Sequence, residues 1–366
     1  MKKVKIYGAG SIGNHLAYAS RSMGWDVLIC DVDADGLERT KTQIYPGRYG
    51  TWDAHIRLCL VQDVPKEEFD VVIIGTPPDS HLDLAIRTLK EERPQVLLIE
   101  KPLCTPTLEN AQMLYELSTQ SETVVCVGYN HTLGQNTVEA EKILRAGKIG
   151  ECITINAGFQ EHWGGIFKAH PWLAGPQDSY LGFSSRGGGA SGEHSHAINI
   201  WQHFAHILNL GKIVEVSAFM DFVEVGNVAY DQICNISVKT ERGYCGFIIQ
   251  DVVTEPPKKY LRIQGEDGFL EWYVNLELEN DAVISQRKGE AVTKNILPKK
   301  RPDDFKWEVE HLQQIVEGKV DESPISLERG LNTMMVIAAA HLSYQQKRVM
   351  HIDYSKGYVR RSIKSL

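Results

Sequence analysis

Short apolar runs alternate with an amphipathic pattern through the first third of the chain. The stretch SIGNHLAYASRSM has helical spacing and ends at Gly24, and it lies between the first two of four apolar runs: VKIYG at 4–8, VLIC at 27–30, VVIIG at 71–75 and VLLIE at 96–100. Runs that are apolar at nearly every position are typical of parallel strands covered by helices on both faces. The pattern therefore predicts an α/β domain with a doubly wound parallel sheet.

The pattern changes after VVCVGYN at 124–130. One helical stretch, NTVEAEKILRAG, precedes segments in which polar and apolar residues alternate, such as CITINA, VEVSAFM, QICNISVK and GYCGFIIQ. Alternation of this kind indicates antiparallel strands with one solvated face. Two helical patterns, WEVEHLQQIVEG and LERGLNTMMVIAAAHLSYQQ, follow near the end. We expect a first domain at 1–127 and an α+β domain, built on a mainly antiparallel open sheet, at 128–366.

Composition narrows the classes of function. The 366 residues, 43% of them apolar, suffice for two hydrophobic cores. A net charge of -8 disfavours nucleic acid as a partner. No segment approaches 18 uncharged apolar residues and no signal peptide is evident, so we expect a cytoplasmic protein without a membrane partner. The seven cysteines form no CxxC pair, which favours reduced thiols and no metal site.

A glycine-rich turn provides the first chemical signal. Residues 8–13 are GAGSIG, a GxGxxG motif directly after a strand and at the start of a helix. Gly8, Gly10 and Gly13 allow a tight turn, close approach of a pyrophosphate and close packing of helix on strand, while the helix N-terminus at Ser11 and Ile12 faces the anion. Asp31 ends the next strand, where a carboxylate binds the adenosine ribose diol, and no arginine follows closely. These features predict a Rossmann domain that binds NAD rather than NADP.

Several further blocks resemble the glucose-fructose oxidoreductase and inositol dehydrogenase (Gfo/Idh/MocA) family over nearly the whole chain. They are TPPDSH at 76–81, EKPL at 100–103, GYN at 128–130, LRAGKIGE at 144–151, GGGASGEHSH at 187–196 and the ending SLERGLNTMMVIAAAHLSYQQKRV. The resemblance implies an active site between the two domains. It also implies a homodimer or homotetramer formed through the open sheet of the second domain.

The resemblance assigns roles to residues of the first domain. The EKP lysine, Lys101, is expected to face the substrate oxygen, where an ammonium group stabilises the charge that develops during hydride transfer. The other cofactor-binding positions implied are Thr76, Pro77, His81, Glu100 and Asn130.

The segment GGGASGEHSH departs from the commonest family pattern, in which Asp precedes His by four residues. A variant with an acid three residues before the histidine fits Glu193 and His196. If one helix contains both, they share a face with Asn199, whereas His194 is rotated about 200° away from His196. We expect His196 to be the base, with a pKa lowered by the helix dipole, and Glu193 to be an orienting or substrate-binding acid, although the two roles could be reversed. The neighbouring histidines also allow a metal cluster, which hydride transfer does not require.

An aromatic and polar segment at 161–186 corresponds to the substrate-contacting loop of the family. It supplies candidates for stacking on a sugar ring or pairing with a carboxylate or phosphate: Trp163, His170, Trp172, Tyr180 and Arg186.

The sequence therefore predicts an NAD-dependent dehydrogenase that acts on a secondary alcohol of a sugar, sugar acid, nucleotide sugar or cyclitol. Two alternatives stay open: a glycosidase-type member that retains NAD through transient oxidation, and a non-catalytic NAD or sugar sensor.

Overall fold

The computed structural model describes residues 1–168 and 170–366. Over these residues, six parallel strands form the first sheet in the order β3-β2-β1-β4-β5-β6. This is the strand order of the dinucleotide-binding Rossmann fold, so the predicted doubly wound sheet is confirmed. The strands are β1 (Lys3–Tyr7), β2 (Asp26–Asp31), β3 (Ile56–Leu60), β4 (Val71–Ile74), β5 (Val96–Ile99) and β6 (Val124–Val127).

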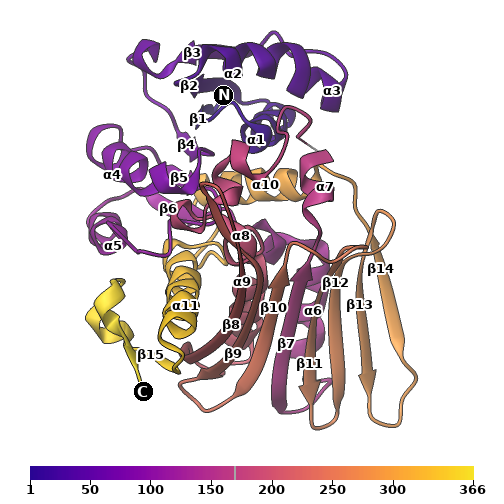
Figure 1. Ribbon diagram of the computed structural model, residues 1–366. Coiled ribbons are helices and arrows are strands. Elements are labelled where there is room, and N and C mark those ends of the chain that lie inside the picture. The colour runs from indigo at the N-terminus through magenta and orange to yellow at the C-terminus, as the bar shows by residue number, and fades with distance from the viewer. Residues whose placement is uncertain (169) are drawn as a thin grey trace.

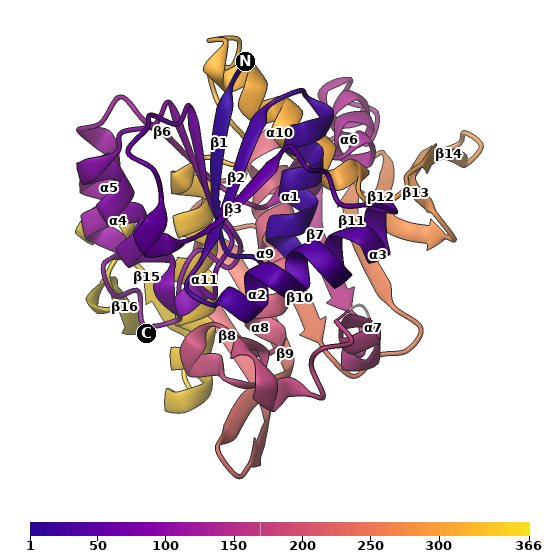
Figure 2. The ribbon, with the colours of Figure 1, turned by 90° about the horizontal axis from the view of Figure 1, so that it is seen from above.

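Helices cover both faces of the first sheet. Figure 2 shows α1, α2 and α3 on one side and α4 and α5 on the other. Their bounds are α1 (Ser11–Ser22), α2 (Ala34–Arg39), α3 (Tyr45–Tyr49), α4 (His81–Glu91) and α5 (Ala111–Thr119). Strands β4 and β5 are buried at every position, which explains why their sequences are apolar throughout.

The second sheet has ten strands in the described part of the chain, in the order β14-β13-β12-β11-β7-β10-β9-β8-β15-β16. All neighbouring pairs are antiparallel except β7 with β10. The prediction of a mainly antiparallel sheet is therefore confirmed. The strands are β7 (Cys152–Gln160), β8 (Ile213–Val225), β9 (Val228–Thr240), β10 (Cys245–Asp251), β11 (Lys258–Gly265), β12 (Gly268–Glu277), β13 (Asn280–Arg287), β14 (Thr293–Pro298), β15 (Met350–Ile352) and β16 (Ile363–Ser365).

Helices pack on one face of the second sheet and link it to the first domain (Figure 1). Four helices contact its strands: α6 (Gln135–Arg145), α8 (Gly189–Glu193), α9 (His196–Ile207) and α11 (Leu327–Gln346). Helix α7 (Trp163–Lys168) follows β7, and α10 (Asp303–Val316) packs on α1 and β5 of the first domain. Helix α10 lies beside α1, where Phe305 stacks on His15 with ring centroids 4.5 Å apart and Trp25 donates to Gln313. The later part of the chain thus returns to the first domain.

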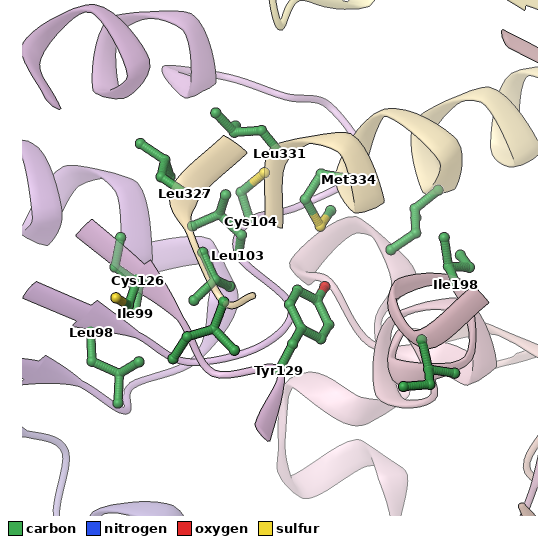
Figure 3. Packing of buried hydrophobic residues seen from close by; sticks show 14 of the residues in the cluster. Leu98, Ile99, Leu103, Cys104, Cys126, Tyr129, Ile198, Leu327, Leu331 and Met334 are labelled. Atoms are coloured by element: carbon green, nitrogen blue, oxygen red, sulfur yellow. The ribbon is translucent and has the colours of Figure 1, made fainter. Parts of the chain in front are cut away.

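A shared core fixes the two domains where the candidate site lies (Figure 3). Leu98 and Ile99 of β5, the segment around Leu103, and Met334 of α11 are all buried in one cluster with Tyr129. This dense packing holds the residues after β5 and β6 in one arrangement. Among the described residues, no helix combines the length and apolar composition needed to span a membrane.

Candidate active site between the two domains

The glycine turn has the geometry of a pyrophosphate cradle. Gly8 has a φ of +105°, and a Cβ there would lie 2.6 Å from the carbonyl oxygen of Gly75. A Cβ on Gly13 would lie 2.0 Å from the oxygen of Gly8, so a side chain would separate α1 from β1. A Cβ on Gly10 would meet no described atom within 4 Å. Close packing on one side and open space on the other fit a nucleotide at this helix N-terminus.

Asp31 is fixed beside this turn. One carboxylate oxygen accepts from the backbone N–H of Ala9 at 2.7 Å, and the other accepts from Asp33 at 3.0 Å. Each carboxylate oxygen has a further lone pair, so the group retains acceptor capacity for two ribose hydroxyls. Ser11 is held by an arginine that sequence analysis did not identify: Arg48 donates to its carbonyl oxygen at 2.9 Å and to its Oγ at 2.8 Å. Ile12 is half-buried and packs on the core.

His81 connects two loops at the carboxyl ends of the strands. Its ring nitrogens lie 2.6 Å from the carbonyl oxygen of Thr76 and 3.1 Å from that of Pro102. The ring is fully buried, and burial lowers its pKa. A neutral ring has one N–H and donates to one of these carbonyl oxygens at a time, so His81 lies between the two loops, and the cofactor contact expected from the sequence stays a prediction. Pro77 is exposed beside it, and Asn130 begins the turn after β6 and is buried.

Lys101 and Glu193 meet across the two domains. The Lys101 Nζ lies 3.0 Å from Glu193 Oε2 and 3.0 Å from the Glu193 carbonyl oxygen. The side chains are 13% and 19% exposed. Burial raises the pKa of Glu193, but Lys101 and His194 outweigh it, so the net shift is downward and the carboxylate is ionised. An ammonium group has three N–H donors, and two are used here, so the third is available to a substrate oxygen.

The helix around His196 differs from the sequence expectation. Helix α8 ends at Glu193 and α9 begins at His196, so a break separates them and one continuous helical stripe is wrong. The pKa of His196 lies well below its usual value because of burial first, and then because of His131 and Lys101. The causes of this shift are thus burial and neighbouring charges, where the sequence analysis named the helix dipole. In the described structure, His196 Nδ1 is buried without a hydrogen-bond partner.

The same break brings His194 into the site, where the sequence placed it facing away. Burial lowers its pKa to about 4, followed by the charge of Lys259, while Glu193 and Glu161 oppose the shift. The other nearby polar groups of α9 have structural partners: Asn199 donates to Thr333, and His203 lies 2.8 Å from Glu141. No group of three or more metal-ligating side chains occurs among the described residues.

The candidate substrate-binding residues of the loop at 161–186 differ in what their side chains contact. Arg186 pairs with Asp79 of the first domain at 2.7 Å, and Trp163 packs edge-on against Tyr230 with its indole N–H unpaired in the described structure, so a ligand contact by either side chain stays a prediction. The Tyr180 phenol is buried near Glu193, which helps to raise its pKa after burial.

Two further loop residues pack together beside the cleft. His170 hydrogen-bonds to the carbonyl oxygen of Ile166 at 2.6 Å, and Trp172 lies edge-on against it. Burial is the main reason that the pKa of His170 is lowered, and the charges of Arg48 and Arg301 lower it further. Because Arg48 also binds Ser11, the His170 ring lies on the side of the loop that faces the glycine turn.

Besides Arg48, sequence reasoning missed three charged groups of the site. Glu308 of α10 is fully buried, and both of its carboxylate oxygens lack a partner in the described structure. Burial, and then the charge of Glu100, raises its pKa, and burial likewise raises the pKa of Glu100. The signal was present, because Phe305, Glu308 and Leu312 share a helical stripe. Lys259 and Glu161, described below, are the other two.

Comparisons with known proteins agree with this geometry. Residues 2–129 match the model of the oxidoreductase family with an NAD-binding Rossmann fold, GFO_IDH_MocA. The uncharacterized oxidoreductase YhhX of Escherichia coli is 32% identical over 127 residues, which are 34% of this chain and 35% of that protein. The match therefore spans about a third of that relative's length.

Solved structures share the fold of both domains. An oxidoreductase from Agrobacterium radiobacter, in complex with NAD+, L-tartaric acid and magnesium, has a TM-score of 0.73 at 17% identity and covers 96% of this chain and 98% of its own. Levoglucosan dehydrogenase in complex with NADH and L-sorbose has a TM-score of 0.74 at 18% identity, with the same coverage. The first domain is thus an NAD-binding Rossmann domain of the type that the GFO_IDH_MocA model describes, and the fold of the whole chain is that of the solved oxidoreductases.

Proposed function

We propose that the protein is an NAD-dependent dehydrogenase that transfers a hydride between nicotinamide and a secondary alcohol or ketone of a sugar, sugar acid, nucleotide sugar or cyclitol. The observation that carries this proposal is the buried Lys101–Glu193 pair at the carboxyl end of β5. Ligands of open α/β sheets collect at this edge, beside the glycine turn. The relatives solved with NAD+ or NADH and a polyhydroxylated ligand support it.

The cofactor is held by the backbone of residues 8–13 and by Asp31 in this proposal. The part of the site next to the nicotinamide is formed by Thr76, Pro77 and Asn130, together with Glu100 and Lys101. His81 supports the loops that carry Thr76 and Lys101. Bound NAD supplies a hydride acceptor, and the residues of this chain supply the rest. The boundary at residue 127 separates this domain from the substrate domain.

Lys101 and His196 have different roles at the substrate alcohol. The free N–H of Lys101 donates to the substrate oxygen and stabilises the alkoxide as negative charge develops. His196 is neutral because its pKa is lowered, so it can accept the alcohol proton near neutral pH. Glu193 orients the ammonium group. Tyr180, His170 and Trp172 border the substrate, whereas Arg186 acts through its pair with Asp79.

The test is the formation of NADH from a panel of sugars, uronic acids, nucleotide sugars and cyclitols at alkaline pH. At least one member is expected to reduce NAD with sustained turnover. Tight NAD binding without NADH from any member would contradict a dehydrogenase and favour the sensor.

We also propose a homodimer or homotetramer formed through the open face of the second sheet. Phe219 is 80% exposed and Phe247 is 42% exposed, and their strand registers place both on the face that helices do not cover. Sedimentation of the wild type should show a multiple of the chain mass, and Phe219→Glu should shift it to the monomer. A monomeric wild type would overturn this part of the proposal.

A further inference from the structure

A second partly buried lysine–glutamate pair lies next to the first. The Lys259 Nζ is 2.6 Å from Glu161 Oε2, and each side chain is only 22% exposed. Lys259 is on β11, and Glu161 directly follows β7. Helix α7, which begins two residues after Glu161, lies at the end of the sheet nearest the first domain (Figure 1).

Strand register places Lys259 on the covered face of the sheet. Lys259 is directly opposite Phe159 of β7, and residues opposite each other in an antiparallel pair point to the same face. Phe159 is buried and stacks on the ring of His196, with centroids 6.3 Å apart. Along β11, the alternate residues Leu261 and Ile263 are fully buried. Lys259 therefore lies on the same face of β11 as the apolar side chains of Leu261 and Ile263. It is the charged residue at the end of this row, close to His196.

The two ammonium groups act on the same histidines. Lys101 and Lys259 both lower the pKa values of His131, His194 and His196, after burial as the main cause. His194 lies within the influence of both carboxylates as well, and its Nε2 is buried with no partner in the described structure. The four charged side chains and His194 thus form one polar cluster.

Charge within this cluster is balanced pair by pair. Burial raises the pKa of Glu161, but Lys259 outweighs it and the net shift is downward. Glu193 behaves in the same way beside Lys101. Each lysine therefore has its own ionised partner. A substrate carboxylate bound here would lie close to two like charges, whereas a hydroxyl group can accept from an ammonium group and donate to a carboxylate.

We propose, building on the dehydrogenase function above, that Lys259 and Glu161 form a second subsite that binds two adjacent hydroxyl groups of the substrate, next to the carbon whose alcohol faces Lys101. The substrate class is then a neutral polyhydroxylated ring, a cyclitol or neutral sugar, and acid sugars are excluded by Glu161 and Glu193. His194 presents a further polar atom to the same ring.

The experiment uses two neutral probes, myo-inositol and D-glucose, and one acidic probe, D-glucuronate. Binding to the protein with NADH bound is measured by calorimetry, and turnover is measured with NAD. The variants are Lys259→Met and Glu161→Gln. Lys258→Met is the matched control, because Lys258 is adjacent, exposed and on the opposite face. Thermal unfolding and NAD affinity of each variant exclude misfolding.

The wild type should prefer a neutral probe over D-glucuronate by about tenfold or more, since the carboxylate of D-glucuronate would lie close to the like charges of Glu161 and Glu193. Lys259→Met and Glu161→Gln should each weaken binding of the neutral probe by about tenfold, with kcat changed less than KM. Glu161→Gln should also increase the affinity for D-glucuronate, because Lys259 then has no carboxylate partner in the protein and can pair with that of the ligand. A purely structural pair would not change the preference between probes.

Two results would overturn the inference while leaving the dehydrogenase proposal intact: D-glucuronate reducing NAD better than both neutral probes, or equal losses for all probes in Lys259→Met. Binding of a neutral probe that depends on Lys259, without any NADH, would support the subsite and contradict the dehydrogenase. Failure of all three probes both to bind and to react would count against both proposals.

Discussion

The cofactor edge and the substrate side of the cleft are built in different ways. The cofactor edge, residues 8–13 and Asp31, comes from one short stretch of chain, and its chemistry is mostly that of the backbone. The substrate side that we propose consists of Lys101, Glu161, Glu193 and Lys259, which come from four distant segments. A backbone cradle is encoded by a short local motif, whereas a set of distant side chains is brought together only by the fold. The difference explains why the cofactor could be predicted from the sequence and the substrate-side charges could not.

The largest effect is expected where the two regions meet. Lys101→Ala should lower kcat by about 100-fold or more and change NAD affinity only a few-fold, because the lost interaction is stronger in the transition state than in the ground state. Steady-state kinetics and NAD titration check this, with the exposed Lys90→Ala as control. Near-normal turnover would remove Lys101 from the mechanism.

The cofactor edge is tested by a glycine that has room for a side chain. Gly10→Ala should weaken NAD binding by about tenfold or more while leaving thermal stability unchanged, since its Cβ meets no described protein atom and would meet the pyrophosphate. Gly47→Ala, equally unobstructed but on α3, is the control. Unchanged NAD affinity in Gly10→Ala would place the pyrophosphate elsewhere.

Asp31 should determine the cofactor preference. The wild type should bind NAD more tightly than NADP, because the carboxylate accepts from the ribose diol and repels a 2′-phosphate. Asp31→Ala should reduce that preference by about tenfold. If NADP binds the wild type equally well, the assignment of Asp31 is wrong.

Much of this comparison could be predicted from the sequence, for physical reasons. Apolar runs and GxGxxG are local patterns, and the structure confirms the sheets that they predict. The break after Glu193 was not visible, because glycine-rich and polar residues there permit both a continuous and a broken helix. Lys259 was missed because its strand was not among the segments identified by alternation. The pairing of Arg186 with Asp79 depends on tertiary contacts that no local pattern contains.

The smallest expected effect is a change in the pH profile of kcat/KM, which distinguishes the role of His196 from that of Glu193. A lowered pKa means that His196 is neutral at and above pH 6.5, so kcat/KM for oxidation should be level there and should fall only as pH drops further. The acidic fall should vanish in His196→Asn, and Glu193→Gln should lose less activity. If Glu193→Gln is the more damaging variant and His196→Asn keeps the acidic fall, the two roles are reversed.

The most direct test of the central claim follows the hydride itself. A neutral polyol deuterated at its carbinol carbons is mixed with the protein and NAD, and the nicotinamide is analysed by mass spectrometry. The account predicts one deuterium in released NADH, a primary isotope effect on turnover, and deuterium transfer about 100-fold slower in Lys101→Ala. Deuterium transfer without net NADH, accompanied by glycoside cleavage, would identify an NAD-retaining glycosidase, and the absence of deuterium from nicotinamide for every polyol tested would contradict hydride transfer altogether.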